Sequence, residues 1–200
     1  DVDVRGKTVL ILINDPGFAT QDPALFKGNA MTYYGRWTYK YEEAARQGAA
    51  AAVIIHDTAP AAYGWDVVRN SWTGPQFHLH RDNDNMDRVP IESWIRRGVA
   101  EEVVAAAGLD LAALERQALS PEFKAVTLGS TMDASVQNRI VRSLSHNIGA
   151  MQPGSLRPDE LFIYTAHWDH IGTDDSVADG QDGIYNGAVD NATGIAALLE

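Results

Sequence analysis

Residues 161–200, LFIYTAHWDHIGTDDSVADGQDGIYNGAVDNATGIAALLE, decide how the second half of this chain is interpreted. The first six residues are apolar, with β-branched and aromatic side chains, which predicts a buried strand. His167 and Asp169 follow this strand, and Asp190 precedes an apolar stretch that predicts a helix. In α/β proteins, strands that end in His and Asp, with another Asp at a neighbouring turn, gather metal ligands at the carboxyl edge of the sheet.

The composition narrows the class of protein. The 200 residues are 45% hydrophobic and 22% charged, which suits one large or two small folded domains. The net charge of -11 argues against nucleic acid or an anionic membrane as a partner. Because cysteine is absent, any metal would need His and carboxylate ligands. No apolar run approaches the roughly 20 residues of a transmembrane helix, and no signal peptide is visible.

The first half of the chain predicts a small mixed domain. Strands are expected at 8–13 and 50–55, with a helix between them at 39–48. This order predicts a right-handed crossover if the strands are parallel. Residues 18–38 predict a long loop. Its aromatic side chains near Tyr33 to Trp37 are expected to pack locally, the alternative being that they line a peptide groove. Residues 58–87 contain several Gly and Pro residues and predict irregular structure.

A change of pattern near residue 126 predicts a domain boundary. Before it, we expect a short strand at 89–91, a helix at 92–107 and a further helix capped by Asp110. After it, residues 124–152 alternate as an antiparallel strand pair that leads into the strand at 161–166. The expected domains are therefore 1–126 and 127–200. The final residues continue a helix without a stop signal, so we expect a piece of a longer protein.

The candidate metal site contains His167, Asp169 and Asp190. Residues two apart on a strand point the same way, so His167 and Asp169 can face one cleft. A neutral imidazole is a good zinc ligand, and a carboxylate on its other ring nitrogen can orient it. Asp190 can cap the following helix or bridge two metal ions. Its combination with His167 favours the metal.

Other metal-like patterns are weaker. An acidic loop contains Asp174, Asp175, Asp179 and Asp182. It could bind calcium, but it lacks a known spacing, and a solvated loop is favoured. Residues 82–87 resemble the start of an EF-hand, but Asp87 stands where Gly is required and Ser93 stands at the twelfth position. His78 and His80 have metal-like spacing without converging ligands.

Two segments carry a family resemblance. AHWDHIG at 166–172 and DGIYNGAVDNATG at 182–194 resemble the two-zinc metallopeptidases of the aminopeptidase Y and glutamate carboxypeptidase type, metallopeptidase family twenty-eight. The segment SHNIGAMQPGSLRPDE at 145–160 is similar to the one before their metal strand. Residues 6–77 resemble the protease-associated domain inserted in many members. The resemblance implies an α/β protein, with a small protease-associated α+β domain followed by the first strands of a zinc-exopeptidase α/β/α sandwich.

The resemblance also implies roles for the three residues. His167 would bind zinc, Asp169 would orient His167, and Asp190 would bridge two zinc ions next to a cis peptide bond to Asn191. The parent enzyme would be a secreted or periplasmic exopeptidase that hydrolyses peptide or protein substrates with metal-activated water. Its general-base Glu and further ligands would follow Glu200, so we expect this chain to bind zinc weakly or not at all and to be inactive.

Three functions thus remain open from the sequence. The first is a piece of a zinc aminopeptidase. The second is a non-catalytic interaction module of the protease-associated type. The third is an acidic calcium-binding protein, which would require stabilisation by calcium that survives removal of Asp190.

Overall fold

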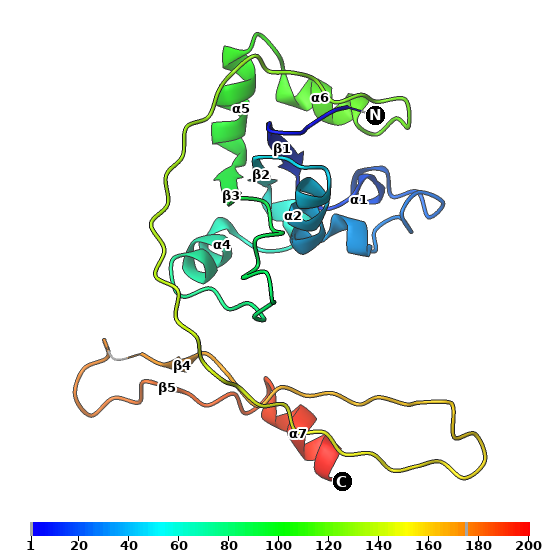
Figure 1. Cartoon of the computed structure of the whole chain (residues 1–200), viewed down its shortest axis with the longest axis vertical. Coiled ribbons are helices and arrows are strands. Elements are labelled where there is room, and N and C mark those ends of the chain that lie inside the picture. The colour runs from blue at the N-terminus through cyan, green and yellow to red at the C-terminus, as the bar shows by residue number, and fades with distance from the viewer. Residues whose placement is uncertain (1, 175) are drawn as a thin grey trace. The chain divides into compact units, whose positions relative to one another are not determined.

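The computed structural model describes residues 2–174 and 176–200. It divides into two compact units, Asp1–Asn138 and Arg139–Glu200 (Figure 1). The first unit is a mixed α/β structure with a small parallel sheet, which confirms the predicted fold class.

The sheet of the first unit has three parallel strands in the order β1-β2-β3. These strands are β1 (Thr8–Leu12), β2 (Ala51–His56) and β3 (Ile91–Arg96). The central strand β2 is buried along its whole length, which its run of Ala, Val and Ile allows because both faces of a parallel sheet are covered. The strands predicted at 8–13 and 50–55 are confirmed.

The helix predicted between these strands is also confirmed. It is α2 (Trp37–Arg46), and Gly48 follows it with φ +74°, a conformation that favours glycine after a helix. The prediction of one long loop at 18–38 is wrong in part. The segment contains most of α1 (Pro16–Thr20) and the 3-10 turn η1 (Tyr33–Gly35). Both are single turns, too short for a period to reveal them.

The prediction of irregular structure at 58–87 is wrong for its first half. This half forms α3 (Thr58–Ala61) and α4 (Trp65–Trp72). The eight residues of α4 bury Val68 and pack Trp72 against the core, so tertiary contacts stabilise a helix that its sequence only weakly predicts.

The predicted helix at 92–107 begins later than expected. Residues 91–96 pair with β2 as β3, and α5 (Arg97–Ala106) starts only after them. Trp94 and Ile95 suit a strand as well as a helix, and the neighbouring strand supplies ladder hydrogen bonds that decide between the two. The next helix, α6 (Leu111–Gln117), is capped as predicted, since the Asp110 carboxylate accepts from the Ala113 N–H at 2.6 Å.

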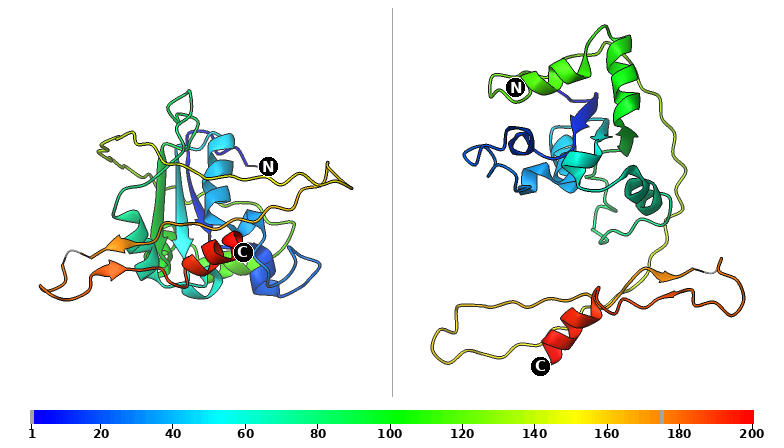
Figure 2. Two further views of the ribbon diagram at one scale, coloured as in Figure 1. Left: turned by 90° about the horizontal axis from the view of Figure 1, so that it is seen from below. Right: turned by 180° about the vertical axis from the view of Figure 1, so that it is seen from behind.

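The alternation of side chains along the strands produces two cores, one on each face of the sheet. Figure 2 shows the backbone of the sheet and of the helices around it in two further views. Ile11 and Ile54 face the core formed with α2, α3 and α4. Leu10 and Ile55 face the core formed with α5 and α6. Leu10 and Ile11 are neighbours on β1, and Ile54 and Ile55 are neighbours on β2. Side chains of successive residues on a strand point to opposite faces of the sheet, so each pair contributes to both cores.

The second unit has little regular structure. It contains a two-residue antiparallel ladder between β4 (Gly172–Thr173) and β5 (Ile184–Tyr185), followed by α7 (Ala192–Leu199). The helix expected after Asp190 is confirmed. Its cap is Asn191, whose side chain accepts from the Gly194 N–H, so the Asp190 carboxylate does not cap the helix.

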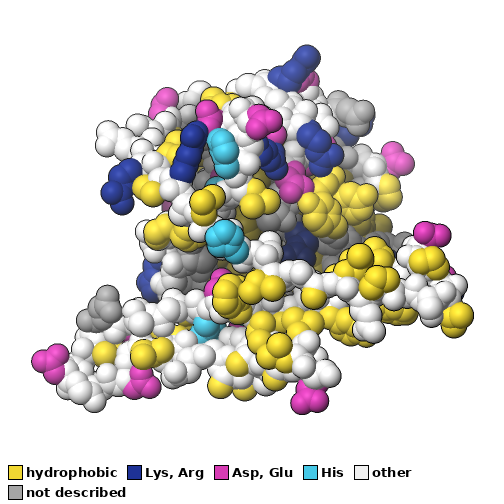
Figure 3. Space-filling model, turned by 60° about the horizontal axis from the view of Figure 1, so that its bottom comes forward, with side chains coloured by type: hydrophobic (Ala, Val, Ile, Leu, Met, Phe, Trp, Pro, Cys, Tyr) yellow, Lys and Arg dark blue, Asp and Glu magenta, His cyan; other side chains and the backbone are white. Residues whose placement is uncertain are grey.

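The strands predicted at 124–152 and 161–166 are wrong, because neither segment forms a strand. A strand needs a neighbour for its ladder bonds and a core for its apolar face, and this unit supplies neither to residues 161–166. Phe162 is therefore 82% exposed and Ile163 78% exposed. Hydrophobic side chains, yellow in Figure 3, lie open on the face drawn there. None of the helices that the structure describes combines the length and the hydrophobicity of a membrane span.

Candidate metal centre

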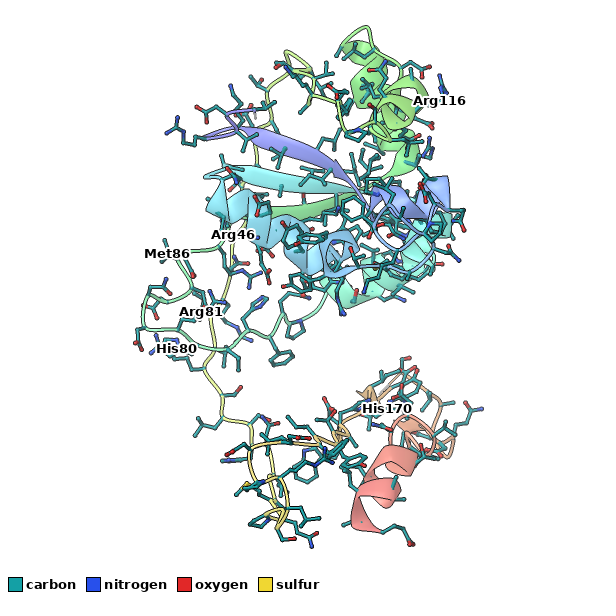
Figure 4. All side chains as sticks on the ribbon, turned by 90° about the vertical axis from the view of Figure 1, so that its right-hand side faces the viewer. Arg46, His80, Arg81, Met86, Arg116 and His170 are labelled. Atoms are coloured by element: carbon teal, nitrogen blue, oxygen red, sulfur yellow. The ribbon has the colours of Figure 1, made fainter. Side chains whose placement is uncertain are left out.

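The second unit brings the three predicted site residues together. His167 Nε2 lies 2.9 Å from Asp190 Oδ1, and His167 Nδ1 lies 3.4 Å from Asp169 Oδ1. The β4–β5 ladder folds the chain back between His167 and Asp190. His170, labelled in Figure 4, lies so close to Gly187 that a Cβ added there would meet the His170 ring carbon Cγ at 3.0 Å. A glycine at 187 thus permits the close approach of the two segments.

The hydrogen bonds of His167 determine which nitrogen is available. Its Nδ1 lies 2.8 Å from the backbone carbonyl of Asp169, and a carbonyl only accepts, so Nδ1 carries the hydrogen. In the neutral ring, Nε2 then presents a lone pair toward Asp190, whose carboxylate oxygen is also an acceptor. Two acceptors at 2.9 Å need a cation between or beside them, either a proton on Nε2 or a metal ion.

The same contacts raise the pKa of His167 above its ordinary value. The largest cause is the hydrogen bond to the Asp169 carbonyl, and the Asp190 and Asp169 carboxylates add to it. The main chain of Asp169 therefore holds the ring at 2.8 Å, while the carboxylate that the sequence suggested for this role lies farther away, at 3.4 Å.

Asp190 is held by a tightly built turn. The Ala192 N–H donates to the Gly187 carbonyl at 3.0 Å, and Thr193 Oγ1 donates to the Val189 carbonyl at 2.7 Å. A Cβ at Gly194 would lie 2.4 Å from Asn191 Oδ1, so a larger residue there would force the capping side chain of Asn191 to shift. The peptide bond between Asp190 and Asn191 is cis, as the resemblance implies.

A hollow of about 460 Å³ lies beside the pair. Its lining combines polar and apolar side chains of the second unit: Ser145, His146, Asn147, Thr165, Ala166, His167, Trp168, Asp169 and Asn191. Clefts of this size hold small ligands or single residues of a chain. The hollow therefore gives a ligand access to the ring of His167.

The side chains at this site are of the types that bind zinc, but there are fewer of them than a catalytic zinc ion usually has. An imidazole nitrogen and a carboxylate oxygen are both zinc ligands, and a catalytic zinc ion usually has three protein ligands. Within residues 2–174 and 176–200, no group of three His, Cys, Asp or Glu side chains is arranged to hold a metal ion. His167 and Asp190 thus offer two donor atoms of the types that zinc binds, one fewer than a catalytic zinc ion usually has.

The other acidic and histidine patterns have local roles. Asp174 Oδ1 accepts from the Ser176 N–H and hydroxyl at 2.9 and 2.6 Å, and Asp182 Oδ1 accepts from the Ile184 N–H at 2.9 Å. These bonds shape the acidic loop, while Asp175 lies outside the described residues. His80, labelled on its loop in Figure 4, has its Nδ1 3.8 Å from Asp84 Oδ1.

Sequence reasoning missed a second pocket, in the first unit. Asp15, Pro16, Phe26, Tyr34, Tyr39 and Lys40 line a hollow of about 500 Å³. The cluster of aromatic residues in this loop was the feature of the sequence that could have indicated the pocket. A peptide groove was considered there only as an alternative to local packing. Lys40 carried no signal, because the carbonyl to which its amine donates belongs to Asn14, which lies 26 positions earlier in the chain.

Comparison with known proteins agrees with the geometry of the second unit. Residues 147–200, about a quarter of the chain, match the model of peptidase family M28, and this segment contains His167, Asp169 and Asp190. No curated protein and no solved structure matches the chain. The family match supports a peptidase-like function, with a metallopeptidase as the class of enzyme that this segment resembles.

Proposed function

We propose that the second unit carries part of the active site of a zinc-dependent exopeptidase of the aminopeptidase type. One observation carries the proposal. His167 presents Nε2 to Asp190 Oδ1 at 2.9 Å, and both residues lie in the segment that matches a peptidase family. In the parent enzyme Asp190 would bridge two zinc ions, and the substrate would be a peptide or protein.

The residues of this chain prepare the site in three ways. The Asp169 carbonyl holds the hydrogen on Nδ1, so that Nε2 of His167 is free to bind a metal ion. The Asp169 carboxylate, 3.4 Å from Nδ1, adds negative charge that increases the basicity of the ring. The turn from Gly187 to Thr193 fixes Asp190. A zinc ion bound here would polarise the scissile carbonyl and lower the pKa of a water molecule.

Catalysis requires more groups than these. A general base and further zinc ligands are needed, and we propose that residues outside this chain supply them. The chain by itself would then bind zinc weakly and show no turnover. We further propose that residues 1–126 form a protease-associated domain, that 127–200 begin the catalytic domain, and that the parent protein is secreted or periplasmic.

Zinc titration of the 200-residue chain by calorimetry tests the proposal. Because each variant removes one ligand, we expect weak binding that His167→Ala or Asp190→Asn abolishes. The control His80→Ala removes a histidine from the first unit and should leave the binding unchanged. Equal zinc affinity in the wild type and in His167→Ala would refute the proposed ligand. Asp169→Asn should weaken binding only modestly, because the backbone carbonyl that holds the ring remains.

A second function, a non-catalytic protein-interaction module, is favoured by one observation in the first unit. This unit has an open pocket with aromatic walls, a surface typical of binding sites. Binding by the first unit is compatible with catalysis by the parent enzyme.

A further inference from the structure

The pocket of the first unit lies between the loop after β1 and the start of α2. Its volume is about 500 Å³, within the range of sites that hold small ligands. Asp15 and Pro16 come from the start of α1, Phe26 and Tyr34 from the loop and η1, and Lys40 from α2. All these residues belong to one compact unit.

The aromatic walls of the pocket form an ordered series. The rings of Phe26 and Tyr34 meet edge to face with centroids 6.2 Å apart, and those of Tyr34 and Tyr39 do so at 5.0 Å. Tyr34 nevertheless remains 53% exposed, so its ring is available to a ligand. Aromatic surfaces arranged in this way favour a further ring, which can add to the edge-to-face series.

Lys40 gives the pocket a positive charge. Its Nζ donates to the Asn14 carbonyl at 2.8 Å, and within the described part of the chain this is its hydrogen bond partner. An ammonium group has three hydrogens to donate, which leaves two for a ligand. Burial lowers the pKa of Lys40 to about 8, despite the nearby charge of Asp15, so the group is still mostly protonated at neutral pH.

Asp15 lines the same pocket, but its oxygens are bound to the loop. Oδ1 accepts from the Gly17 N–H at 3.1 Å, while Oδ2 accepts from the Thr32 N–H at 3.1 Å and from the Thr32 hydroxyl at 2.8 Å. The residue is only 7% exposed. A Cβ at Gly35 would lie 3.0 Å from Asp15 Oδ2, so the loop closes tightly over this carboxylate. A ligand therefore meets the amine of Lys40 more readily than the charge of Asp15.

We propose that this pocket binds the C-terminal residue of a peptide whose last side chain is aromatic. The ring packs against Phe26, Tyr34 and Tyr39, and the free α-carboxylate accepts from Lys40 Nζ. Charge complementarity argues for the carboxylate, and the aromatic walls argue for the ring. The open side of the pocket leaves room for the preceding residues of the peptide. No residue of the second unit takes part, so the inference stands or falls separately from the zinc site.

Calorimetric titration of the 200-residue chain with the peptide acetyl-Ala-Ala-Phe tests this inference. The matched probe is the same peptide with a C-terminal amide, which removes the charge and keeps the ring. We expect the acid to bind about tenfold more tightly, the usual effect of a hydrogen bond to a charged group. Equal affinity for the acid and the amide would overturn the proposal, and this comparison needs no variant to fold.

Variants assign the interaction to its residues. Lys40→Met should reduce the affinity for the acid to that for the amide, while the exposed Lys7→Met should bind the acid like the wild type. Tyr34→Ala should weaken both peptides. Acid binding that is unchanged in Lys40→Met would exclude the amine as its partner. A third probe, 3-phenylpropionate, separates a peptide from a free small acid: binding as tight as that of the peptide acid would overturn the choice of a peptide.

Discussion

The half-buried amine of Lys40 makes a quantitative prediction about stability. Its pKa falls from 10.5 to about 8 in the folded chain, chiefly because burial disfavours the charged form. Each pKa unit corresponds to about 1.4 kcal/mol, so the folded state is destabilised by about 3 kcal/mol when Lys40 is charged in both states. Lys40→Met keeps most of the aliphatic chain and removes the charge.

The sign of the pH dependence follows from the order of the two pKa values. Below pH 8 the folded and unfolded states both hold the proton, and the full destabilisation is present. Between pH 8 and 10.5 the folded state loses its proton first, so the wild type gains stability relative to Lys40→Met. At pH 7 the variant should therefore be the more stable, by about 2 kcal/mol after loss of the roughly 1 kcal/mol hydrogen bond to the Asn14 carbonyl.

Urea unfolding followed by tryptophan fluorescence measures this difference. Four of the five tryptophans, Trp37, Trp65, Trp72 and Trp94, belong to the first unit, so the signal reports mainly on its unfolding. The free energy of unfolding of Lys40→Met minus that of the wild type should fall by about 3 kcal/mol between pH 7 and 10.5. Lys7→Met gives the effect of removing an exposed lysine over the same range. A difference between Lys40→Met and the wild type that does not change with pH would refute the reasoning.

Three further predictions concern the core, a helix cap and the turn beside Asp190. Ile54→Ala removes a side chain of 0% exposure from the central strand and should lower the free energy of unfolding by about 2–5 kcal/mol in the same urea assay; a loss below about 1 kcal/mol would contradict the central place of β2 in the core. Asp110→Ala removes the cap of α6 and should cost about 1 kcal/mol, while Asp110→Asn should retain most of it. Gly194→Ala places a Cβ 2.4 Å from Asn191 Oδ1 and should speed amide exchange in α7, whereas Gly149→Ala, which meets nothing within 4 Å, should not; equal exchange in both variants would count against the tight turn.

Several elements could be predicted from local sequence because local interactions are enough to specify them. The apolar runs of β1 and β2 favour strands of a covered parallel sheet, and Asp110 has a side chain that can cap a helix from its own position. The pairing of His167 with Asp190 was also expected, from the residue types that follow the apolar run at 161–166 and precede α7. Their roles in binding zinc remain predictions.

Other features depended on parts of the chain that are distant in sequence. The boundary between β3 and α5 lies at Arg96 because β2 supplies a parallel neighbour to residues 91–96. Residues 161–166 have the composition of a strand but no paired neighbour, and without ladder bonds they form none.

The environment of Lys40 also combines a feature that local sequence specifies with contacts that only the folded chain provides. The sequence determined that a lysine lies on a helix, but the loop that places Asn14, Asp15 and the aromatic rings around its amine exists only in the folded unit. Composition and local pattern therefore determined the class of fold and the types of ligand. The tertiary structure decided which strands pair and which charges are buried, because both depend on neighbours that local sequence does not specify.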